Sequence, residues 1–129
     1  MKTIILFEDE QAISNVFRVS FERMGYTVLQ AATFKEATKI AAEYVPPIDL
    51  LIADMIVRVS ICIRVATALA STHPQMAVLF ISGLPPEVLT HSGLMKNSEI
   101  LTFPRIEFLQ KPFLPWILEE HVRELIGVS

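Results

Sequence analysis

IDLLIADM, at Ile48–Met55, is the stretch that decides the fold, because its apolar centre leads directly into an acid, Asp54. The centre, Leu50–Ala53, is continuously apolar rather than alternating, which predicts a strand buried on both faces in a parallel sheet covered by helices. Asp54 then stands at the carboxyl end of this strand. In open α/β sheets ligands bind at that edge, so other chemically active residues should gather around Asp54.

Length and composition favour a globular protein of one domain, residues 1–129. The chain is 52% hydrophobic and 19% charged, and its mean hydropathy is positive, which argues for helices that cover a sheet and against disorder. Its apolar runs fall short of the roughly 18 residues of a membrane span. Glu8, Asp9 and Glu10 interrupt the opening apolar run, so a secretory signal is not expected. We therefore expect a cytoplasmic protein.

Charge and cysteine content narrow the function classes further. The formal net charge is -3 and the pI is about 5.6, so electrostatics give no reason to expect nucleic acid as a direct partner. Cys62 is the only cysteine, which excludes an intramolecular disulfide and favours a small buried hydrophobic residue.

Strand-like and helix-like segments alternate along the whole chain. The expected strands are Thr3–Phe7, Tyr26–Gln30, Leu50–Ala53, Met76–Ile81 and Ile106–Gln110. The expected helices run from about Glu10 to Met24, Thr33 to Tyr44, about Ser60 to Thr72, Pro85 to about Gly93, and from Pro115 onward, with Leu118, Val122 and Leu125 on the last one's buried face. Five strands alternating with five helices predict an α/β fold, a doubly wound parallel sheet in the flavodoxin-like order 2-1-3-4-5.

Two helical segments rest on particular signals. Thr33 is expected to cap its helix, with Glu36 at the capping-box position three residues on. Residues 57–65 alternate between apolar and polar in a strand-like period of two. Nevertheless Val65, Ala66 and Leu69 restore helical spacing, and parallel strands need a crossover connection, so a helix is expected there. Residues 94–105 look irregular.

Polar residues follow four of the expected strands: Glu8 and Asp9, Asp54, Ser82, and Lys111. In the expected strand order the first and third strands are neighbours, so Asp9 should lie beside Asp54. Clustered carboxylates with no His or Cys nearby favour Mg²⁺, which often shares a phosphate oxygen. The Ser82 hydroxyl and the Lys111 ammonium could hold the other oxygens of a phosphoryl group, which leaves Asp54 as the nucleophile.

The motifs FEDE at Phe7–Glu10, IDLLIADM around Asp54, FISG at Phe80–Gly83 and FLQKPF at Phe108–Phe113 occur in this order and spacing. Together they resemble the receiver domain of two-component response regulators, over residues 2 to about 126. The last two motifs, with the long segment between them, are most similar to receivers of hybrid histidine kinases.

The resemblance implies a role for each matching residue. Asp54 would accept a phosphoryl group from the phosphohistidine of a histidine kinase or phosphotransfer protein. Asp9 would bind Mg²⁺ together with Asp54 and the backbone carbonyl of Ile56, with Glu8 assisting. The remaining roles fall to three residues: Ser82 and Lys111 would hold the phosphoryl oxygens, and Phe108 would be the switch aromatic that moves with Ser82.

The chain departs from the family just after Asp54, where Arg58, Ile61 and Cys62 replace the usual Pro, acid or Ser, and Gly. A second hypothesis is therefore a pseudo-receiver, the same fold used as a constitutive protein-interaction module. The apolar run Ile56–Val65 indicates either a dimer or partner surface or an enlarged core. A homodimer is left open. So is the choice between a free-standing protein, favoured by Met1 close to the first strand, and a piece of a larger kinase.

A third hypothesis is a phosphatase similar to the haloacid dehalogenase family, which places a second acid two residues after its nucleophile. Here that position is Ile56, so a proton donor for turnover is missing. We expect phosphoryl transfer to the protein itself and slow self-dephosphorylation, without turnover of an external substrate.

Plain structural interpretations stand beside these functional ones. The acids at 8–10 could be a solvated helix start, Ser82 turn chemistry, Lys111 a surface lysine and Phe108 a core aromatic. The histidines are scattered without metal-ligand spacing and are expected in solvated or loop positions: His73, His91 and His121. Trp116 lies off the buried face of its helix and could anchor a partner or pack beneath a loop.

Overall fold

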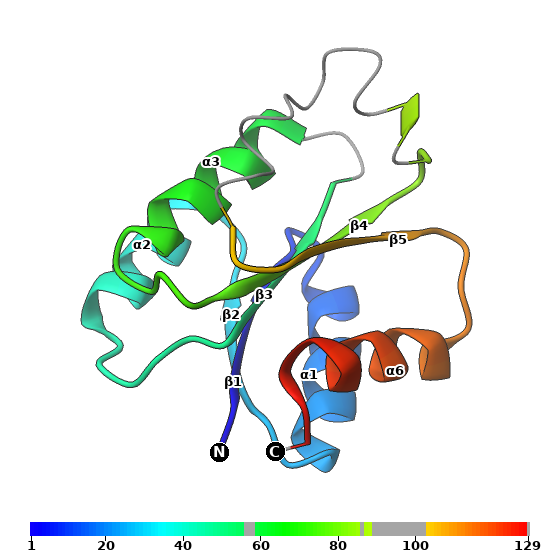
Figure 1. Cartoon of the computed structure of the whole chain (residues 1–129), viewed down its shortest axis with the longest axis horizontal. Helices are drawn as coiled ribbons and strands as arrows, with labels where there is room; N and C mark the ends of the chain where they lie inside the picture. Colours follow the sequence, from blue (N-terminus) through cyan, green and yellow to red (C-terminus); the bar gives the residue numbers. More distant parts are fainter. Residues whose placement is uncertain (56–58, 86, 89–102, 129) are drawn as a thin grey trace.

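A parallel sheet in the order β2-β1-β3-β4-β5 runs through the centre of the protein (Figure 1). The computed structural model describes residues 1–55, 59–85, 87–88 and 103–128. The strands are β1 (Thr3–Phe7), β2 (Thr27–Ala31), β3 (Leu50–Asp54), β4 (Ala77–Ser82) and β5 (Ile106–Gln110). The strand order and the parallel pairing confirm the sequence-based prediction.

The continuous apolar runs form strands because both sheet faces are covered. β1 and β4 are buried along their whole length, and β3 is buried up to Ala53. Successive side chains point to opposite faces, so Ile4, Leu6 and Ile52 belong to one apolar cluster. Ile5 and Leu51 belong to the other. A strand that alternates between apolar and polar residues can leave one face in water. These strands are apolar on both faces, so both faces must be covered.

The described residues form the four helices α1 (Gln11–Arg23), α2 (Phe34–Glu43), α3 (Val59–Ala70) and α6 (Pro115–Ile126). These helices pack on both faces of the sheet, α1 and α6 on one and α2 and α3 on the other (Figure 1). Phe21 of α1 packs in one cluster with Leu118, Val122 and Leu125 of α6. Ala37 of α2 and the buried face of α3 pack in the other. Five helices were expected; the fifth, from Pro85 to about Gly93, falls mostly on residues outside the described part of the chain, as do most of residues 94–105.

The segment with the ambiguous pattern is a helix. Its buried residues are Cys62, Ile63, Val65, Ala66 and Leu69, and Val59 and Ile61 are partly buried against the same core. The described part of the Ile56–Val65 run therefore fits the enlarged core better than the partner surface. Cys62 is buried, as expected. No helix of the described residues is long and apolar enough to cross a membrane.

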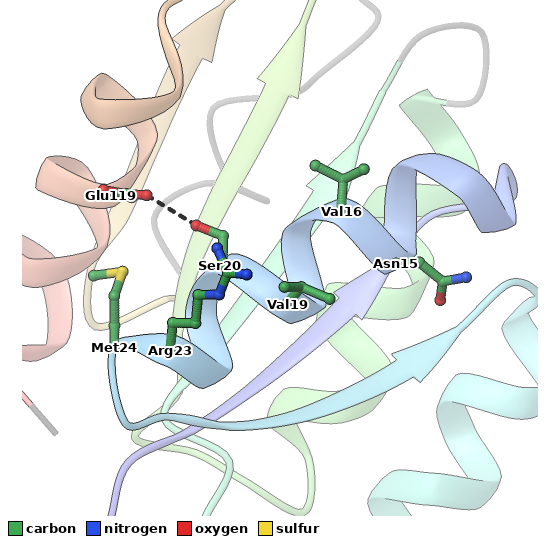
Figure 2. Close-up of a pocket in the computed structure, with 7 residues that line it drawn as sticks. All are labelled: Asn15, Val16, Val19, Ser20, Arg23, Met24 and Glu119. Carbon is green, nitrogen blue, oxygen red and sulfur yellow. Dashed lines mark hydrogen bonds between the residues drawn. The ribbon is translucent and has the colours of Figure 1, made fainter.

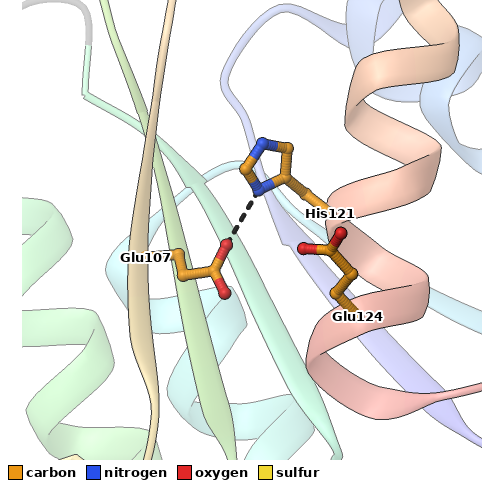
Figure 3. Close-up of side chains that lie close together, drawn as sticks. All are labelled: Glu107, His121 and Glu124. Atoms are coloured by element: carbon orange, nitrogen blue, oxygen red, sulfur yellow. Dashed lines mark hydrogen bonds and ion pairs between the residues drawn. The ribbon is translucent and has the colours of Figure 1, made fainter.

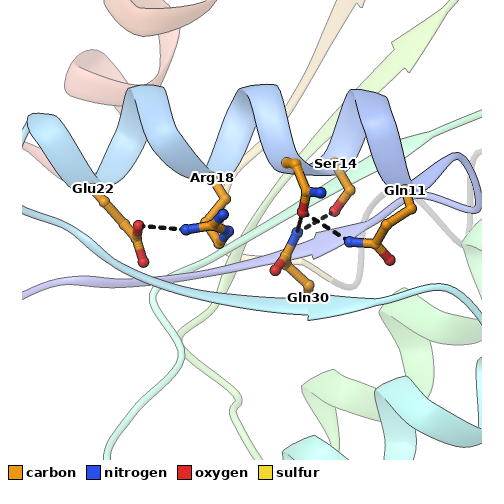
Figure 4. Close-up of polar contacts among 6 residues, drawn as sticks. Gln11, Ser14, Arg18, Glu22 and Gln30 are labelled. Carbon is orange, nitrogen blue, oxygen red and sulfur yellow. Dashed lines mark hydrogen bonds and ion pairs between the residues drawn. The ribbon is translucent and has the colours of Figure 1, made fainter.

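Local polar contacts fix how two helices begin and pack. The Thr33 hydroxyl accepts the N–H of Glu36 at 3.1 Å, as a capping box requires, although the Glu36 carboxylate accepts from Ala32 N at 2.9 Å and not from Thr33 N. α1 is held to β2 by Gln30, whose Nε2 donates to the buried Ser14 hydroxyl at 2.8 Å and to Asn15 Oδ1 at 3.1 Å (Figure 4).

His73 lies in the loop between α3 and β4, one of the two positions expected for it, but it is buried and not solvated. His73 is 6% exposed, accepts the N–H of Ile48 at Nδ1 at 3.1 Å, and its Nε2 lies 3.0 Å from the Ala41 carbonyl oxygen. The ring thus satisfies one backbone group near the end of α2 and one just before β3. His91 lies outside the described residues.

Trp116 is 55% exposed. Of its two interpretations, the one in which it packs beneath a loop therefore does not hold.

Candidate functional site

Asp54 and Lys111 form an ion pair at the carboxyl edge of the sheet. β3 delivers Asp54 as its last residue, and Lys111 directly follows β5. Lys111 Nζ lies 2.7 Å from Asp54 Oδ2, and the two side chains are 30% and 3% exposed, respectively. Asp54 Oδ1 is buried and has no hydrogen-bond partner among the described residues. One oxygen of this carboxylate is therefore neutralised and the other is unsatisfied.

Glu8 is the second buried acid at this edge. It follows β1 directly, is 7% exposed, and its Oε1 also lacks a partner among the described residues. Burial, followed by the negative charges of Asp54 and Asp9, raises the pKa of Glu8 to about 7, while Lys111 acts in the opposite direction. β1 and β3 are hydrogen-bonded neighbours with Phe7 opposite Ala53. The sequence-predicted juxtaposition of these strand ends is therefore present.

Buried polar groups are normally hydrogen-bonded, so two unpartnered carboxylate oxygens at one sheet edge suggest that a cation or donor belongs there. The available ligands are all oxygens, from Asp54, Glu8 and the exposed Asp9, which suits Mg²⁺. The acids present therefore fit the expected ion. Ile56, expected to contribute its carbonyl oxygen, lies outside the described residues, as does Arg58.

Ser82 and Phe108 lie on the two strands beyond β3. Ser82 ends β4, is 3% exposed, and its hydroxyl accepts the N–H of Leu84 at 2.9 Å, which is turn chemistry. Its carbonyl oxygen accepts the N–H of Lys111 at 2.8 Å, so it also fixes where the lysine leaves the sheet. Phe108 is partly buried, with its ring centroid 5.6 Å from that of Phe80. Both predicted residues thus lie along the same edge or the strand leading to it.

Cys62 makes a contact that the sequence did not indicate. Its thiol lies 3.4 Å from the backbone carbonyl oxygen of Asp54. Cys62 follows Asp54 by eight residues and lies in the first turn of the helix after that strand. This spacing was the available sequence signal for the contact. The Cys62 thiol therefore ties the start of α3 to the main chain of Asp54.

A groove of about 540 Å³ lies elsewhere, between α1 and α6 (Figure 2). Asn15, Val16, Val19, Ser20, Arg23 and Met24 of α1 line it together with Glu119 of α6. Ser20 bridges the helices by donating to Glu119 Oε2 at 2.8 Å. None of the sequence-predicted site residues is part of this lining, so the groove and the acid cluster are separate features.

Known proteins that resemble the chain were found by sequence and by structure. No family model matches it. The sensor kinase CckA of Brucella abortus is 27% identical over 124 residues, which is 96% of this chain and 12% of that protein. The alkaline phosphatase synthesis transcriptional regulatory protein PhoP of Bacillus subtilis is 25% identical over 128 residues, 99% of this chain and 50% of that protein. The chain thus spans half or less of these curated relatives.

The solved structures agree with the sequence comparison. The receiver domain of the hybrid histidine kinase CckA superposes with a TM-score of 0.72 and 29% identity, covering 96% of this chain and 98% of that one. A response regulator receiver domain from Clostridium thermocellum gives a TM-score of 0.75 at 24% identity, covering 98% and 95%. The resemblance drawn from the motifs is confirmed: in sequence and fold, the chain is similar to response regulator receiver domains, including that of a hybrid kinase.

Proposed function

We propose that this chain, similar in sequence and fold to response regulator receiver domains, accepts a phosphoryl group on Asp54. One observation carries the proposal. The Asp54 side chain is almost fully buried, with one oxygen held by Lys111 and the other without a partner among the described residues. A carboxylate arranged in this way is desolvated and oriented, as a nucleophile should be.

The transfer itself needs little more than positioning and charge compensation. An oxygen of Asp54 attacks the phosphorus of a phosphohistidine, an acyl-phosphate bond forms, the P–N bond breaks, and its electron pair returns to the imidazole. Lys111 stays close enough to balance the added negative charge, and the Ser82 hydroxyl can donate its hydrogen to a phosphoryl oxygen. The donor would be a histidine kinase or phosphotransfer protein.

Mg²⁺ is the cofactor that the acids at this edge would hold, through Asp9 and Asp54 with Glu8 nearby. The ion would neutralise charge on the phosphoryl oxygens during transfer. Before transfer, burial in the first place and the negative charges of Asp54 and Asp9 in the second raise the pKa of Glu8. We assign this function to residues 1–129 as one receiver domain that binds partner proteins, with no turnover of an external substrate.

The test is phosphorylation by a small donor. Acetyl phosphate or phosphoramidate with MgCl₂ should add the mass of one phosphoryl group to the wild type and none to Asp54→Asn. Asp49→Asn is the matched control, because Asp49 lies in the same stretch at the other end of β3, where it accepts the N–H of Thr3 at 2.8 Å. It should be labelled like the wild type. Equal labelling of the wild type and Asp54→Asn would refute the proposal.

The pseudo-receiver is the second candidate function, and the unusual residues Ile61 and Cys62 favour it. The two candidates separate on binding of beryllofluoride with MgCl₂. A phosphoacceptor binds this phosphoryl mimic and the NMR signals of Ser82 and Phe108 shift, whereas a constitutive interaction module keeps its spectrum unchanged while remaining folded.

A further inference from the structure

A second cluster of ligating side chains lies between β5 and α6, in a place that the phosphoryl chemistry does not use. Among the residues that the structure describes, one group of three His, Cys, Asp or Glu side chains has ligand atoms that all lie within 4.8 Å of one another. The group consists of Glu107, His121 and Glu124, and their side chains point toward one another (Figure 3).

The fold brings these three residues together in two steps. His121 and Glu124 are three residues apart on α6, so they share one face of the helix. Glu107 lies on the edge strand β5, and its Oε1 is 2.8 Å from His121 Nδ1. The Glu107 and His121 side chains are 28% and 30% exposed, while Glu124 is exposed. Two ligands are thus partly shielded, and the third can adjust its position.

The donor set differs in kind from that around Asp54. One imidazole nitrogen and two carboxylate oxygens suit Zn²⁺ and similar transition metals, which take three protein ligands and a water in open sites. Glu124 also lies in the last turn of α6, where the negative end of the helix dipole favours a cation. One cation, the guanidinium of Arg105, already lies at this helix end. Its Nη1 donates to the carbonyl oxygens of Glu124 and Leu125 at 3.0 and 3.3 Å.

Arg105 is the competing charge. Its Nη2 lies 3.6 Å from Glu107 Oε2, so the guanidinium faces one carboxylate oxygen and His121 faces the other. The two carboxylates and the one guanidinium leave a net charge of about -1 beside the imidazole, which still attracts a divalent cation. Arg105 therefore weakens the site without occupying the ligand atoms that face His121.

We propose that Glu107, His121 and Glu124 bind a divalent transition-metal ion of the Zn²⁺ type between β5 and α6. The ion replaces the direct contact between His121 and Glu107 and ties the edge strand to the last helix. Because Glu107 directly precedes Phe108, the same tie restrains the strand that carries this aromatic residue. The site is independent of Asp54 and goes beyond the proposed phosphoryl transfer.

The experiment is a calorimetric titration of ZnCl₂ into the whole chain in excess MgCl₂, which occupies oxygen-only sites. We expect one Zn²⁺ per chain that depends on His121, with His121→Ala and Glu107→Gln each weakening binding by about tenfold or more. Zn²⁺ should raise the melting temperature of the wild type, since it binds the folded state, and should shift the His121 ring signals in NMR spectra.

Two controls keep this result specific. Glu120→Gln changes an exposed acid next to His121 on α6 and should leave the titration unchanged. Asp9→Asn changes the other acid cluster and should also leave it unchanged, so failure here is distinct from failure of phosphorylation. Far-UV circular dichroism verifies that each variant folds. Zn²⁺ binding that survives His121→Ala and Glu107→Gln, that disappears in Asp9→Asn, or that is absent from the wild type would overturn the proposal.

Discussion

The two ends of the sheet satisfy their polar groups in opposite ways. At the amino end, Thr3 N donates to Asp49 Oδ2 at 2.8 Å and the Thr3 hydroxyl lies 2.9 Å from the Tyr44 hydroxyl, while His73 serves two backbone groups. At the carboxyl end, Glu8 and Asp54 each leave a buried oxygen without a partner among the described residues. The polar groups named at the amino end are paired within the fold, whereas these two carboxylate oxygens are not.

His73→Ala should produce the largest change at the amino end. The substitution leaves the buried N–H of Ile48 and the Ala41 carbonyl without partners and opens a cavity, so we expect a loss of about 3 kcal/mol in the free energy of unfolding. Urea denaturation measures this loss. Labelling of Asp54 at temperatures where the variant stays folded should be unchanged, because His73 contacts the opposite end. A loss below about 0.5 kcal/mol would mean that the ring is not a structural bridge.

Lys111→Met should produce the next largest effect, now at the carboxyl end. It removes the ammonium group that lies 2.7 Å from Asp54 Oδ2, and we expect phosphorylation by a small donor to slow about 100-fold. The exposed Lys39 on α2 supplies the control Lys39→Met, which should react like the wild type. Unfolding of the single variants Lys111→Met and Asp54→Asn and of the double variant measures how much Lys111 also contributes to stability. The effect of Lys111→Met on the free energy of unfolding should be smaller in Asp54→Asn, because the buried negative charge is gone. Equal rates for both lysine variants would contradict the expectation.

Much of the fold and of the site at the carboxyl end could be predicted from the sequence, because both depend on local sequence patterns. Continuous apolar runs such as Leu50–Ala53 predict buried parallel strands, and such strands place Glu8, Asp54 and Lys111 at one edge whatever the details of the loops. The helix around Val65 was accessible only through topology, because its alternating pattern fits a strand equally well. The burial of Leu118, Val122 and Leu125 followed directly from helical spacing.

Most of the contacts that could not be predicted join residues far apart in sequence. His73 binds backbone groups 25 and 32 residues away, and nothing in its neighbouring sequence marks a polar residue as buried. The Cys62 thiol reaches a main-chain oxygen eight residues earlier in the chain; every residue carries such an acceptor, so the spacing between the strand end and the helix was the only sequence signal for it. His121 meets Glu107 only because α6 packs beside β5. Side-chain contacts of this kind are set by tertiary packing and not by local propensity.

Glu8→Gln tests whether the acids at the carboxyl end destabilise the metal-free fold. The pKa of Glu8 is about 7 in the folded protein and 4.5 in the unfolded chain, so between these values the folded state holds the extra proton. Stability of the wild type should therefore fall as the pH rises from about 4.5 to 7. At pH 8 the variant should be more stable by about 2 kcal/mol, with little difference at pH 5.

Denaturation of both proteins in EDTA at pH 5 and pH 8 measures this difference. Adding MgCl₂ at pH 8 should narrow it, because a cation offsets the charge on Glu8 in the wild type and has less to offset in the variant. A variant that is less stable than the wild type at pH 8 would show that Glu8 is satisfied there, and the contrast between the two ends of the sheet would be lost.

Tyr44→Phe should have the smallest effect and gives the sharpest test of the amino end. Removing one hydroxyl leaves the 2%-exposed Thr3 side chain unpaired, so we expect a loss of about 1 kcal/mol in the free energy of unfolding. Adding Thr3→Val should recover part of that loss, because replacing both partners by apolar groups of similar shape is nearly neutral. Recovery shows that the stability comes from matching partners, whereas additive losses would show that each hydroxyl acts separately. At the carboxyl end the logic reverses: there, a single neutralisation at Glu8 is stabilising, because no partner from the described chain is lost with it.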